Sequence, residues 1–267
     1  MATLWCGKVV FTNIEAIIFD KDGTLAEVEA FLCQLAHRRS QQIEARIPGL
    51  QEALLRAFGV ECSYPLGELR GDRLHPGGLM AVASRQENII AAAAYVAATG
   101  LGWAASLDLV REAFQAADWL NQSKAKQTPL IPGAMLLLQR LMAANLRLGI
   151  LSSDSQSNVD DFVAHCALNP YLSVAAGVQG NLSKSDPVLI QQVLLKLGAS
   201  AAQTLMIGDS QIDIQLAKTF GLAGCIGFTG GWSSTPELAS ADVSTNQFAD
   251  IHADIHLAES SLLGTPI

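Results

Sequence analysis

The chain has few charged residues, and basic side chains are the scarcer kind. Only 16% of its 267 residues are charged, with 17 lysines and arginines against 25 aspartates and glutamates. The formal net charge of −8 disfavours a nucleic-acid partner, because binding to a phosphate backbone depends on a surplus of basic groups. An anionic substrate would likewise be repelled at long range, so its capture requires local positive potential.

Cysteine pairs and long apolar runs are also lacking. The five cysteines show no Cys-x-x-Cys spacing, which predicts neither a zinc site nor a disulfide framework. The longest apolar stretch, residues 89–98, is too short to cross a bilayer. The first ten residues do not join a basic segment to a sustained apolar one. We therefore expect a cytoplasmic protein with reduced thiols and no membrane partner.

A short apolar run near the start of the chain ends at two carboxylates. Residues 17–19 read Ile-Ile-Phe, and Asp20-Lys21-Asp22-Gly23-Thr24 follows. Such a run predicts a buried strand, and open α/β sheets place their chemistry at the carboxyl ends of strands. Two carboxylates this close repel each other unless a cation or a shared proton relieves them. For this segment alone, an ordinary acidic turn remains the alternative.

Three later segments supply the partners that such a pair needs. A second apolar run ends in Ser152-Ser153-Asp154, and a third ends in Gly208-Asp209-Ser210, with Asp213 shortly after it. Lys184 lies between them, just before a helix expected over residues 187–197. Each segment has a structural alternative, either a helix cap or a solvated surface position. Their order along the chain favours one shared site.

These segments resemble the motifs of the haloacid dehalogenase superfamily, and most closely its phosphoglycolate-phosphatase-type branch. Residues 20–24 resemble the first motif, Ser152 the second, Lys184 the third, and 208–210 with Asp213 the fourth. Ser153 stands where the family often has Asn, and both side chains can donate hydrogen bonds. The resemblance implies an α/β fold with a Rossmann-like, doubly wound, mainly parallel sheet. It is weak between about residue 26 and residue 128, so it does not imply a particular substrate.

The chemistry of phosphate monoesters suggests a role for each residue. A carboxylate that attacks an anionic phosphate requires a divalent cation, and Mg²⁺ prefers carboxylate, carbonyl and water oxygens. We expect a magnesium-dependent phosphatase that hydrolyses a small phosphorylated metabolite through an aspartyl-phosphate. Asp20 would be the nucleophile and Asp22 the general acid and base. The expected metal ligands are Asp20, Asp22 and Asp209, with Asp213 acting through water or a hydrogen bond, and the expected phosphoryl-binding residues are Ser152, Ser153 and Lys184.

The interval between the first two motifs predicts a second domain. Its apolar spacing is helical, with helices expected from about residue 28, over 50–58, from a capping box at Ser84, and from Ser106 to 121. We therefore predict an α/β core formed by residues 1–25 and 129–267, with an inserted all-α cap over 26–128. A cap of this kind excludes bulk water from the reaction. In its least helical part, the candidate specificity residues are Arg70, Arg73 and His75, with a solvated loop as the alternative.

Other activities remain open on the same residues. A sugar phosphomutase would share every core residue and differ in what the cap admits. A phospho-accepting signalling module also combines Asp, Ser and Lys, but it lacks the leaving-group acid. A dehalogenase needs neither Asp22 nor Asp209, so their presence argues against that activity. A phosphonatase needs a cap lysine that forms a Schiff base, and Lys124 and Lys126 fit this role poorly because they lie near the cap exit. The oligomeric state has no signal in the sequence.

Overall fold

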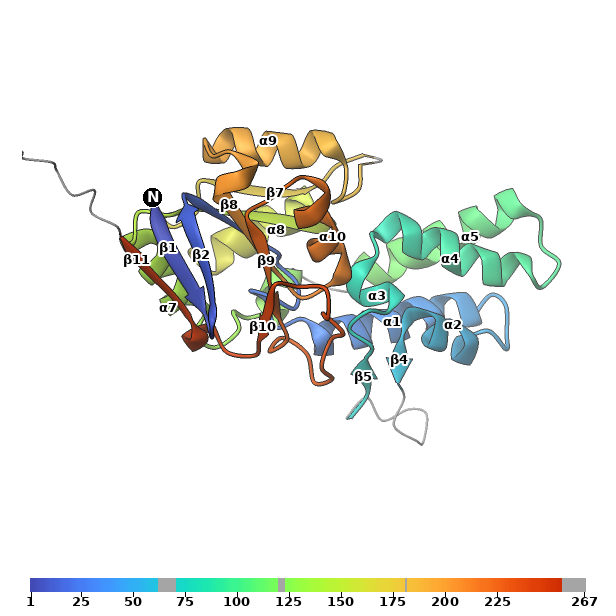
Figure 1. The fold of residues 1–267 in the computed structure, drawn as a ribbon. Helices are drawn as coiled ribbons and strands as arrows, with labels where there is room; N and C mark the ends of the chain where they lie inside the picture. Colours follow the sequence, from blue (N-terminus) through green and yellow to red (C-terminus); the bar gives the residue numbers. More distant parts are fainter. Residues whose placement is uncertain (62–70, 120–122, 181, 256–267) are drawn as a thin grey trace, which may run out of the picture.

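A parallel sheet forms the centre of the molecule (Figure 1). The computed structural model describes residues 1–61, 71–119, 123–180 and 182–255. The six strands pair in the order β10-β9-β8-β3-β6-β7, and every pairing is parallel. This confirms the predicted α/β class. The strands are β3 (Ala16–Phe19), β6 (Arg147–Ser155), β7 (Val174–Val178), β8 (Thr204–Gly208), β9 (Gly224–Phe228) and β10 (Val243–Thr245).

Strand β3 lies in the middle of this sheet, and its neighbours carry the other predicted motifs. Phe19 pairs with Ile150 of β6 on one side and with Ile207 of β8 on the other. All four residues of β3 are buried, as expected of a parallel strand covered on both faces. The residues that follow β3, β8 and the middle of β6 therefore emerge together at one edge of the sheet.

Helices cover both faces of the sheet, which confirms the doubly wound arrangement. Ile17 and Phe19 pack into one apolar cluster with residues of α7 and α8, whereas Ala16 and Ile18 pack into another with residues of α9 and α10. Helix α9 begins after Asp186, with Pro187 in its first turn, as the sequence predicts. The helices are α7 (Ala134–Ala143), α8 (Gln156–His165), α9 (Pro187–Leu197) and α10 (Gln211–Thr219).

A second sheet joins the start of the chain to its late part and was not anticipated from the sequence. It is antiparallel, with the order β11-β1-β2. Leu4, Phe11 and Ile251 carry its inner face into the apolar cluster that also contains α7. Its strands are β1 (Ala2–Cys6), β2 (Val9–Ile14) and β11 (Ile251–Ile255), and the 3₁₀ turns of the core are η1 (Ala201–Gln203) and η2 (Phe248–Asp250).

The inserted segment lies to one side of the central sheet (Figure 1) and has its own apolar cluster. Phe31, Leu54, Phe58, Val96 and Phe114 belong to this cluster. The domain boundaries at residues 26 and 128 remain a prediction. The helices of this segment are α1 (Glu29–Glu44), α2 (Gln51–Phe58), α3 (Leu79–Val82), α4 (Arg85–Ala97), α5 (Trp103–Trp119) and α6 (Lys124–Gln127).

The insertion departs in one detail from the expected all-α composition. Strands β4 (Val60–Glu61) and β5 (Arg73–Leu74) form a short antiparallel pair. The reason is Gly59, which ends α2 in the left-handed conformation at φ 87° and accepts a hydrogen bond from the His75 backbone N–H at 2.8 Å. A glycine in this conformation turns the chain out of the helix at no steric cost.

The local signals at helix ends were accurate in one case and misplaced in another. The capping box at Ser84 is present, since Ser84 N donates to Glu87 at 2.7 Å and Glu87 N donates to the Ser84 hydroxyl at 3.3 Å. The prediction that α5 begins at Ser106 is wrong, since the helix begins at Trp103. The Ser106 hydroxyl lies inside the first turn and donates to Gly102 O at 3.0 Å.

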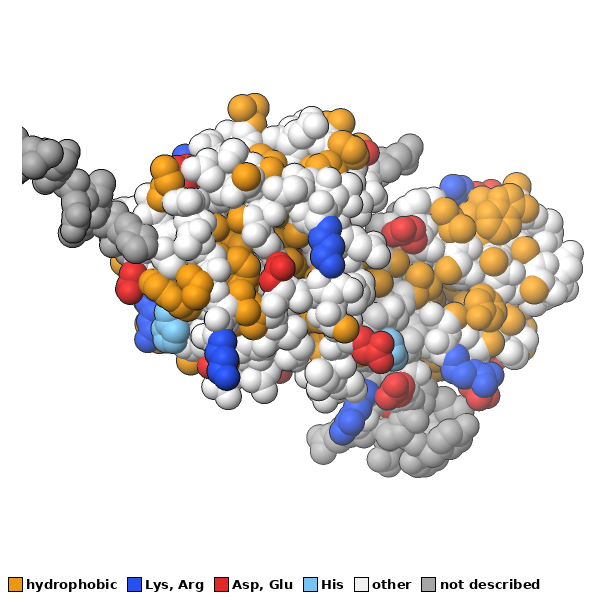
Figure 2. Space-filling model, in the orientation of Figure 1, with side chains coloured by type: hydrophobic (Ala, Val, Ile, Leu, Met, Phe, Trp, Pro, Cys, Tyr) orange, Lys and Arg blue, Asp and Glu red, His pale blue; other side chains and the backbone are white. Residues whose placement is uncertain are grey.

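The outer face of the insertion is partly apolar. Figure 2 shows hydrophobic side chains gathered over this part of the molecule. Among the described residues of the insertion, Ile90, Tyr95, Leu101 and Trp103 are large hydrophobic residues that are exposed. Among the described helices, none is long and apolar enough to cross a membrane.

Candidate active site

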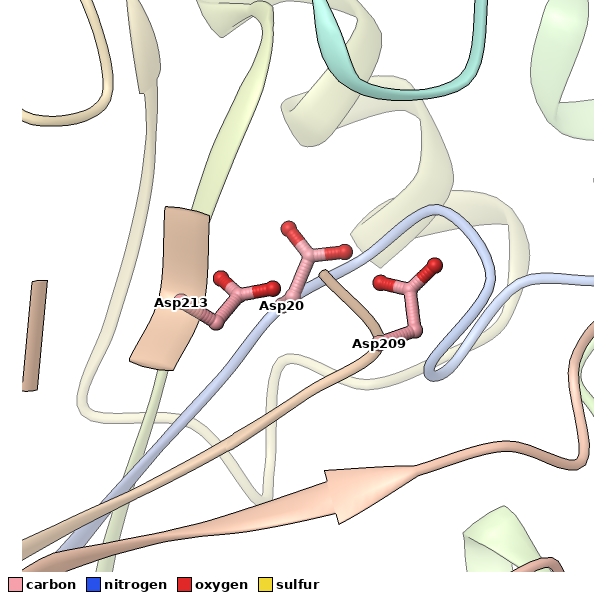
Figure 3. Close-up of side chains that lie close together, drawn as sticks. All are labelled: Asp20, Asp209 and Asp213. Carbon is pink, nitrogen blue, oxygen red and sulfur yellow. The ribbon is translucent and has the colours of Figure 1, made fainter. Parts of the chain in front are cut away.

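Three buried carboxylates face one another where β3 and β8 end. Asp20 follows β3, Asp209 follows β8, and Asp213 lies in the first turn of α10. One oxygen from each lies within 4.8 Å of the others, and Figure 3 shows the Asp20 carboxylate between the other two. An all-oxygen, anionic group of this size is suited to a hard divalent cation.

The start of α10 fixes Asp213 inside the site. Asp213 Oδ2 accepts hydrogen bonds from the Ser210 backbone N–H at 3.1 Å and from its hydroxyl at 2.6 Å. Gly208 leaves room for this arrangement, since a Cβ there would lie 2.3 Å from the Asp213 carboxyl carbon. Asp213 is fully buried, which rules out the alternative of an exposed helical residue. Ser210, rather than Asp209, caps the helix.

Lys184 brings a cation to these carboxylates from the loop before α9. Its ammonium group donates to Asp20 Oδ1 and, at 2.6 Å, to Asp213 Oδ1. Burial opposes its charge, but Asp20 and Asp213 together raise the pKa of Lys184 above its usual value. Lys184 therefore remains charged and is 4% exposed, which rules out a solvated surface position.

The three carboxylates together carry more negative charge, when ionised, than the single Lys184 ammonium group neutralises. Burial raises the pKa of Asp20 to about 6 against the opposing Lys184, and Asp213 adds to the rise. Burial also raises the pKa of Asp209 well above its usual value, with Asp20 and Asp213 acting in the same direction. A bound divalent cation would relieve this surplus of buried negative charge.

Two side chains outside the predicted set hold Asp209. The Thr24 hydroxyl donates to its Oδ1 at 3.2 Å, and the Trp232 indole N–H donates to its Oδ2. In the sequence, only the Gly230-Gly231 pair just before Trp232 indicates that this loop packs closely against another part of the backbone. A Cβ on Gly231 would lie 1.8 Å from Gly23 O, so this loop approaches the turn after β3 too closely for any other residue.

Asp22 lies outside the carboxylate group and belongs to a separate ion cluster. Its Oδ1 accepts from Lys21, and its Oδ2 accepts from Lys124 at 2.6 Å. Asp154 Oδ2 forms ion pairs with the same two ammonium groups, at 3.0 Å from Lys21 and 2.6 Å from Lys124. We call Lys21, Asp22, Lys124 and Asp154 the four-residue ion cluster. It joins the turn after β3, the end of β6 and helix α6.

The charges in this cluster stabilise one another. Burial alone would raise the pKa of Asp154, but Lys124 and Lys21 hold it well below its usual range. In return, Asp154 and Asp22 outweigh the effect of burial and raise the pKa of Lys124. The sequence predicts no role for Lys124 or Asp154 in this cluster, because the two residues are 30 positions apart and no motif or periodicity relates them.

The two predicted serines lie at the same edge of the sheet. Ser152 is buried within β6, and its hydroxyl accepts from the Asp154 backbone N–H at 3.1 Å. It does not cap the following helix, because Ser155 does so by accepting from Asn158 N at 3.3 Å. Ser153 is half-buried.

Among the described residues, the contacts given above for the carboxylate group and the ion cluster include none of the predicted specificity residues. Arg73 is exposed on β5, and Arg70 lies outside the described residues. His75 is exposed, and its Nδ1 accepts from the Gly77 backbone N–H at 3.1 Å.

Known proteins share both this sequence pattern and this fold. The family model of haloacid dehalogenase-like hydrolases matches residues 14–221. The chain belongs to this family. It is 29% identical to a phosphoglycolate phosphatase of Rhodospirillum rubrum over 212 residues, which cover 78% of this chain and 77% of that protein. It is 27% identical to the protein CbbY of Rhodobacter capsulatus over 214 residues, covering 79% of this chain and 83% of the relative.

A solved structure extends the similarity to the whole fold. The crystal structure of a predicted phosphoglycolate phosphatase from Haemophilus somnus superposes with a TM-score of 0.62 at 21% identity. The match covers 90% of this chain and 96% of that one. This match shows that the fold is shared. The sequence relatives confirm the predicted similarity to the phosphoglycolate-phosphatase-like branch of this hydrolase family.

Proposed function

We propose that this hydrolase is a magnesium-dependent phosphatase that cleaves a small phosphorylated metabolite through an aspartyl-phosphate on Asp20. The observation that carries the proposal is the position of Asp20. Its carboxylate stands at the end of the central strand, against the Lys184 ammonium group and between two other buried carboxylates. An acidic residue with this combination of neighbours is suited to nucleophilic attack on phosphorus.

The donor set favours Mg²⁺. Asp20, Asp209 and Asp213 offer only carboxylate oxygens, close together and buried, and hard cations prefer such ligands. When bound, Mg²⁺ would screen the repulsion between the attacking carboxylate and the phosphate oxygens. Asp20 and Asp209 are the proposed ligands among the predicted set. Asp22 is the third expected ligand. Its side-chain oxygens accept hydrogen bonds from Lys21 and Lys124, so it would have to turn away from these lysines to bind the cation.

The proposed reaction has two steps. In the first, an Asp20 oxygen attacks phosphorus, the ester P–O bond breaks, and Asp22 gives a proton to the departing alkoxide. In the second, Asp22 takes a proton from water as that water attacks phosphorus, which releases inorganic phosphate and regenerates Asp20. Ser152, Ser153 and Lys184 would donate hydrogen bonds to the phosphoryl oxygens, where negative charge accumulates in the transition state.

The names of the relatives suggest where the substrate search should begin. Since several are phosphoglycolate phosphatases, we propose short phosphorylated acids, with 2-phosphoglycolate first. Arg70, Arg73 and His75 are retained as proposed specificity residues of the insertion. Replacing Arg73 with alanine should then raise KM for the preferred metabolite and leave p-nitrophenyl phosphate almost unaffected, because remote contacts act only on substrates that reach them.

Phosphate release provides the decisive test. The wild-type protein should release phosphate from at least one member of a metabolite panel with Mg²⁺ and lose this activity in excess chelator. Asp20→Asn should retain less than about 1% of turnover, and intact-mass measurement should show no phosphoprotein. The matched control is Asp108→Asn, whose side chain is 70% exposed. A stable phosphoprotein without turnover would instead support a signalling role, and isomerised sugar phosphate without release would support a mutase.

A further inference from the structure

The loop after β9 links the carboxylate group to the insertion through one side chain. We infer that Trp232 is a positioning residue, which holds Asp209 in the orientation needed for cation binding and couples that carboxylate to the insertion. The inference rests on the proposed function, because it concerns the Mg²⁺ site proposed there.

The polar edge of Trp232 contacts a proposed metal ligand directly. Its indole N–H donates to Asp209 Oδ2, while Thr24 donates to Oδ1 at 3.2 Å. A carboxylate oxygen that accepts one hydrogen bond still has a lone pair for a cation. Such outer hydrogen bonds fix the direction of a ligating group, and losing them weakens metal binding. Indole donates only one hydrogen bond, and here it is directed at the site.

The apolar ring of Trp232 lies in the insertion. The side chain is 8% exposed and belongs to the apolar cluster of that segment. Among the residues that the structure describes, every other buried member of the cluster comes from the range 28–114. Trp232 itself follows β9 of the core, far along the chain. A single rigid side chain therefore contacts Asp209 with its polar edge and the insertion with its apolar faces.

The backbone beside Trp232 is attached to the insertion as well. The Ser233 N–H and hydroxyl donate to the Glu29 carboxylate at 2.8 and 2.7 Å. Glu29 is the first residue of α1 and also accepts from the Leu74 backbone N–H at 2.9 Å. Helix α1 and strand β5 are thus joined to the loop that carries Trp232.

On its other side, Trp232 lies close to the turn after β3. A Cβ on Gly23 would lie 2.4 Å from the indole nitrogen, so the turn after β3 packs directly against the ring. Residues 230–233 therefore contact the turn that follows Asp20, Asp209 itself and the start of the insertion. Packing alone accounts for the buried ring, but it does not account for an N–H directed at Asp209.

Removing the N–H while keeping an aromatic ring separates these two roles. Mg²⁺ binding to the full-length protein, measured by calorimetry without substrate, should weaken by about 10-fold or more in Trp232→Phe. Trp103→Phe is the matched control, because Trp103 is 50% exposed on the insertion, and it should bind as the wild type does. Asp209→Asn should abolish binding and so identify the site that is being measured.

The outcomes distinguish this inference from the proposal on which it rests. Equal Mg²⁺ affinity in a folded Trp232→Phe variant overturns the inference and leaves the proposed function intact. A wild-type protein that binds no Mg²⁺ overturns both. If Trp232→Phe does not fold, Glu29→Ala keeps the indole and loosens its anchor. That variant should weaken binding about 3-fold, less than the roughly 10-fold expected for a residue that contacts the ligand, because Glu29 acts on Asp209 only through the loop. Unchanged affinity in it overturns the coupling.

Discussion

The Lys124 ammonium group lies 2.6 Å from Asp22 Oδ2, although the two residues are 102 positions apart. This contact joins the exit of the insertion to the proposed acid and base. With Lys21 on Oδ1, both oxygens of the Asp22 carboxylate face lysines. Asp154 forms ion pairs with the same lysines. Asp22 can therefore turn toward a leaving group while both ammonium groups keep a carboxylate partner.

Removing this contact should impair the step that needs an acid. We expect Lys124→Met to lower kcat about 10- to 100-fold for an alkyl phosphate, a part of what general acid–base catalysis contributes. The loss should be much smaller for p-nitrophenyl phosphate, whose leaving group needs little protonation. Lys126→Met is the matched control, since Lys126 is exposed on the same short helix. An equal loss for both substrates would contradict a positioning role for Lys124.

Removing the acid itself should separate the two chemical steps. Asp22→Asn should still transfer phosphate from p-nitrophenyl phosphate to Asp20, because this leaving group departs unassisted. The intermediate should then accumulate, since no base remains to activate water. Intact-mass measurement after mixing would detect the phosphoprotein, with an alkyl phosphate as the contrasting substrate. If neither substrate phosphorylates the variant, the role assigned to Asp22 is wrong.

The raised pKa of Asp20 predicts how stability depends on pH. Its pKa rises from 3.8 to about 6 on folding, so between these values the folded state holds a proton that the unfolded state has lost. Ionisation of Asp20 therefore destabilises the fold as pH rises through this window. Without divalent cations, Asp20→Asn should gain stability relative to wild type by up to about 3 kcal/mol between pH 4 and pH 7.

Urea unfolding at several pH values would measure this difference. Asp108→Asn, with its exposed side chain, should show a nearly constant difference from wild type. Added Mg²⁺ should stabilise the wild type much more than Asp20→Asn, because a ligand stabilises the folded state that binds it. If Asp20→Asn raises the free energy of unfolding by the same amount at every pH, the pKa of Asp20 is not raised in the folded state.

Gly231 packs so closely against the Gly23 backbone that any side chain at position 231 should displace the turn after β3. In Gly231→Ala the new Cβ would lie 1.8 Å from Gly23 O, so the loop and the turn after β3 must separate. We expect a loss of about 1–3 kcal/mol in the free energy of unfolding, as is usual for overpacking, together with a loss of turnover. Gly102→Ala is the control, because a Cβ there meets nothing within 4 Å. A thermal melt and a phosphate-release assay on both variants would check the expectation.

The strands and helices that position the carboxylate group could be predicted because their signals are local. Short apolar runs bounded by turn residues marked β3 and β8, and Pro187 marked the start of α9. The Ser106 prediction failed for a physical reason: a serine hydroxyl can cap a helix or bond back to an earlier carbonyl, and nearby residues do not decide between them.

The order of the motif segments, the α/β class and the proximity of Asp20 to Asp209 could all be inferred from the sequence. Parallel strands bring residues at their carboxyl ends to one edge, so position along the chain already implied position in space. The contacts of Asp22 with Lys124 and of Trp232 with Asp209 became visible only in the folded protein. These contacts depend on how the insertion and the loop after β9 pack against the core, and no periodicity or motif encodes such packing.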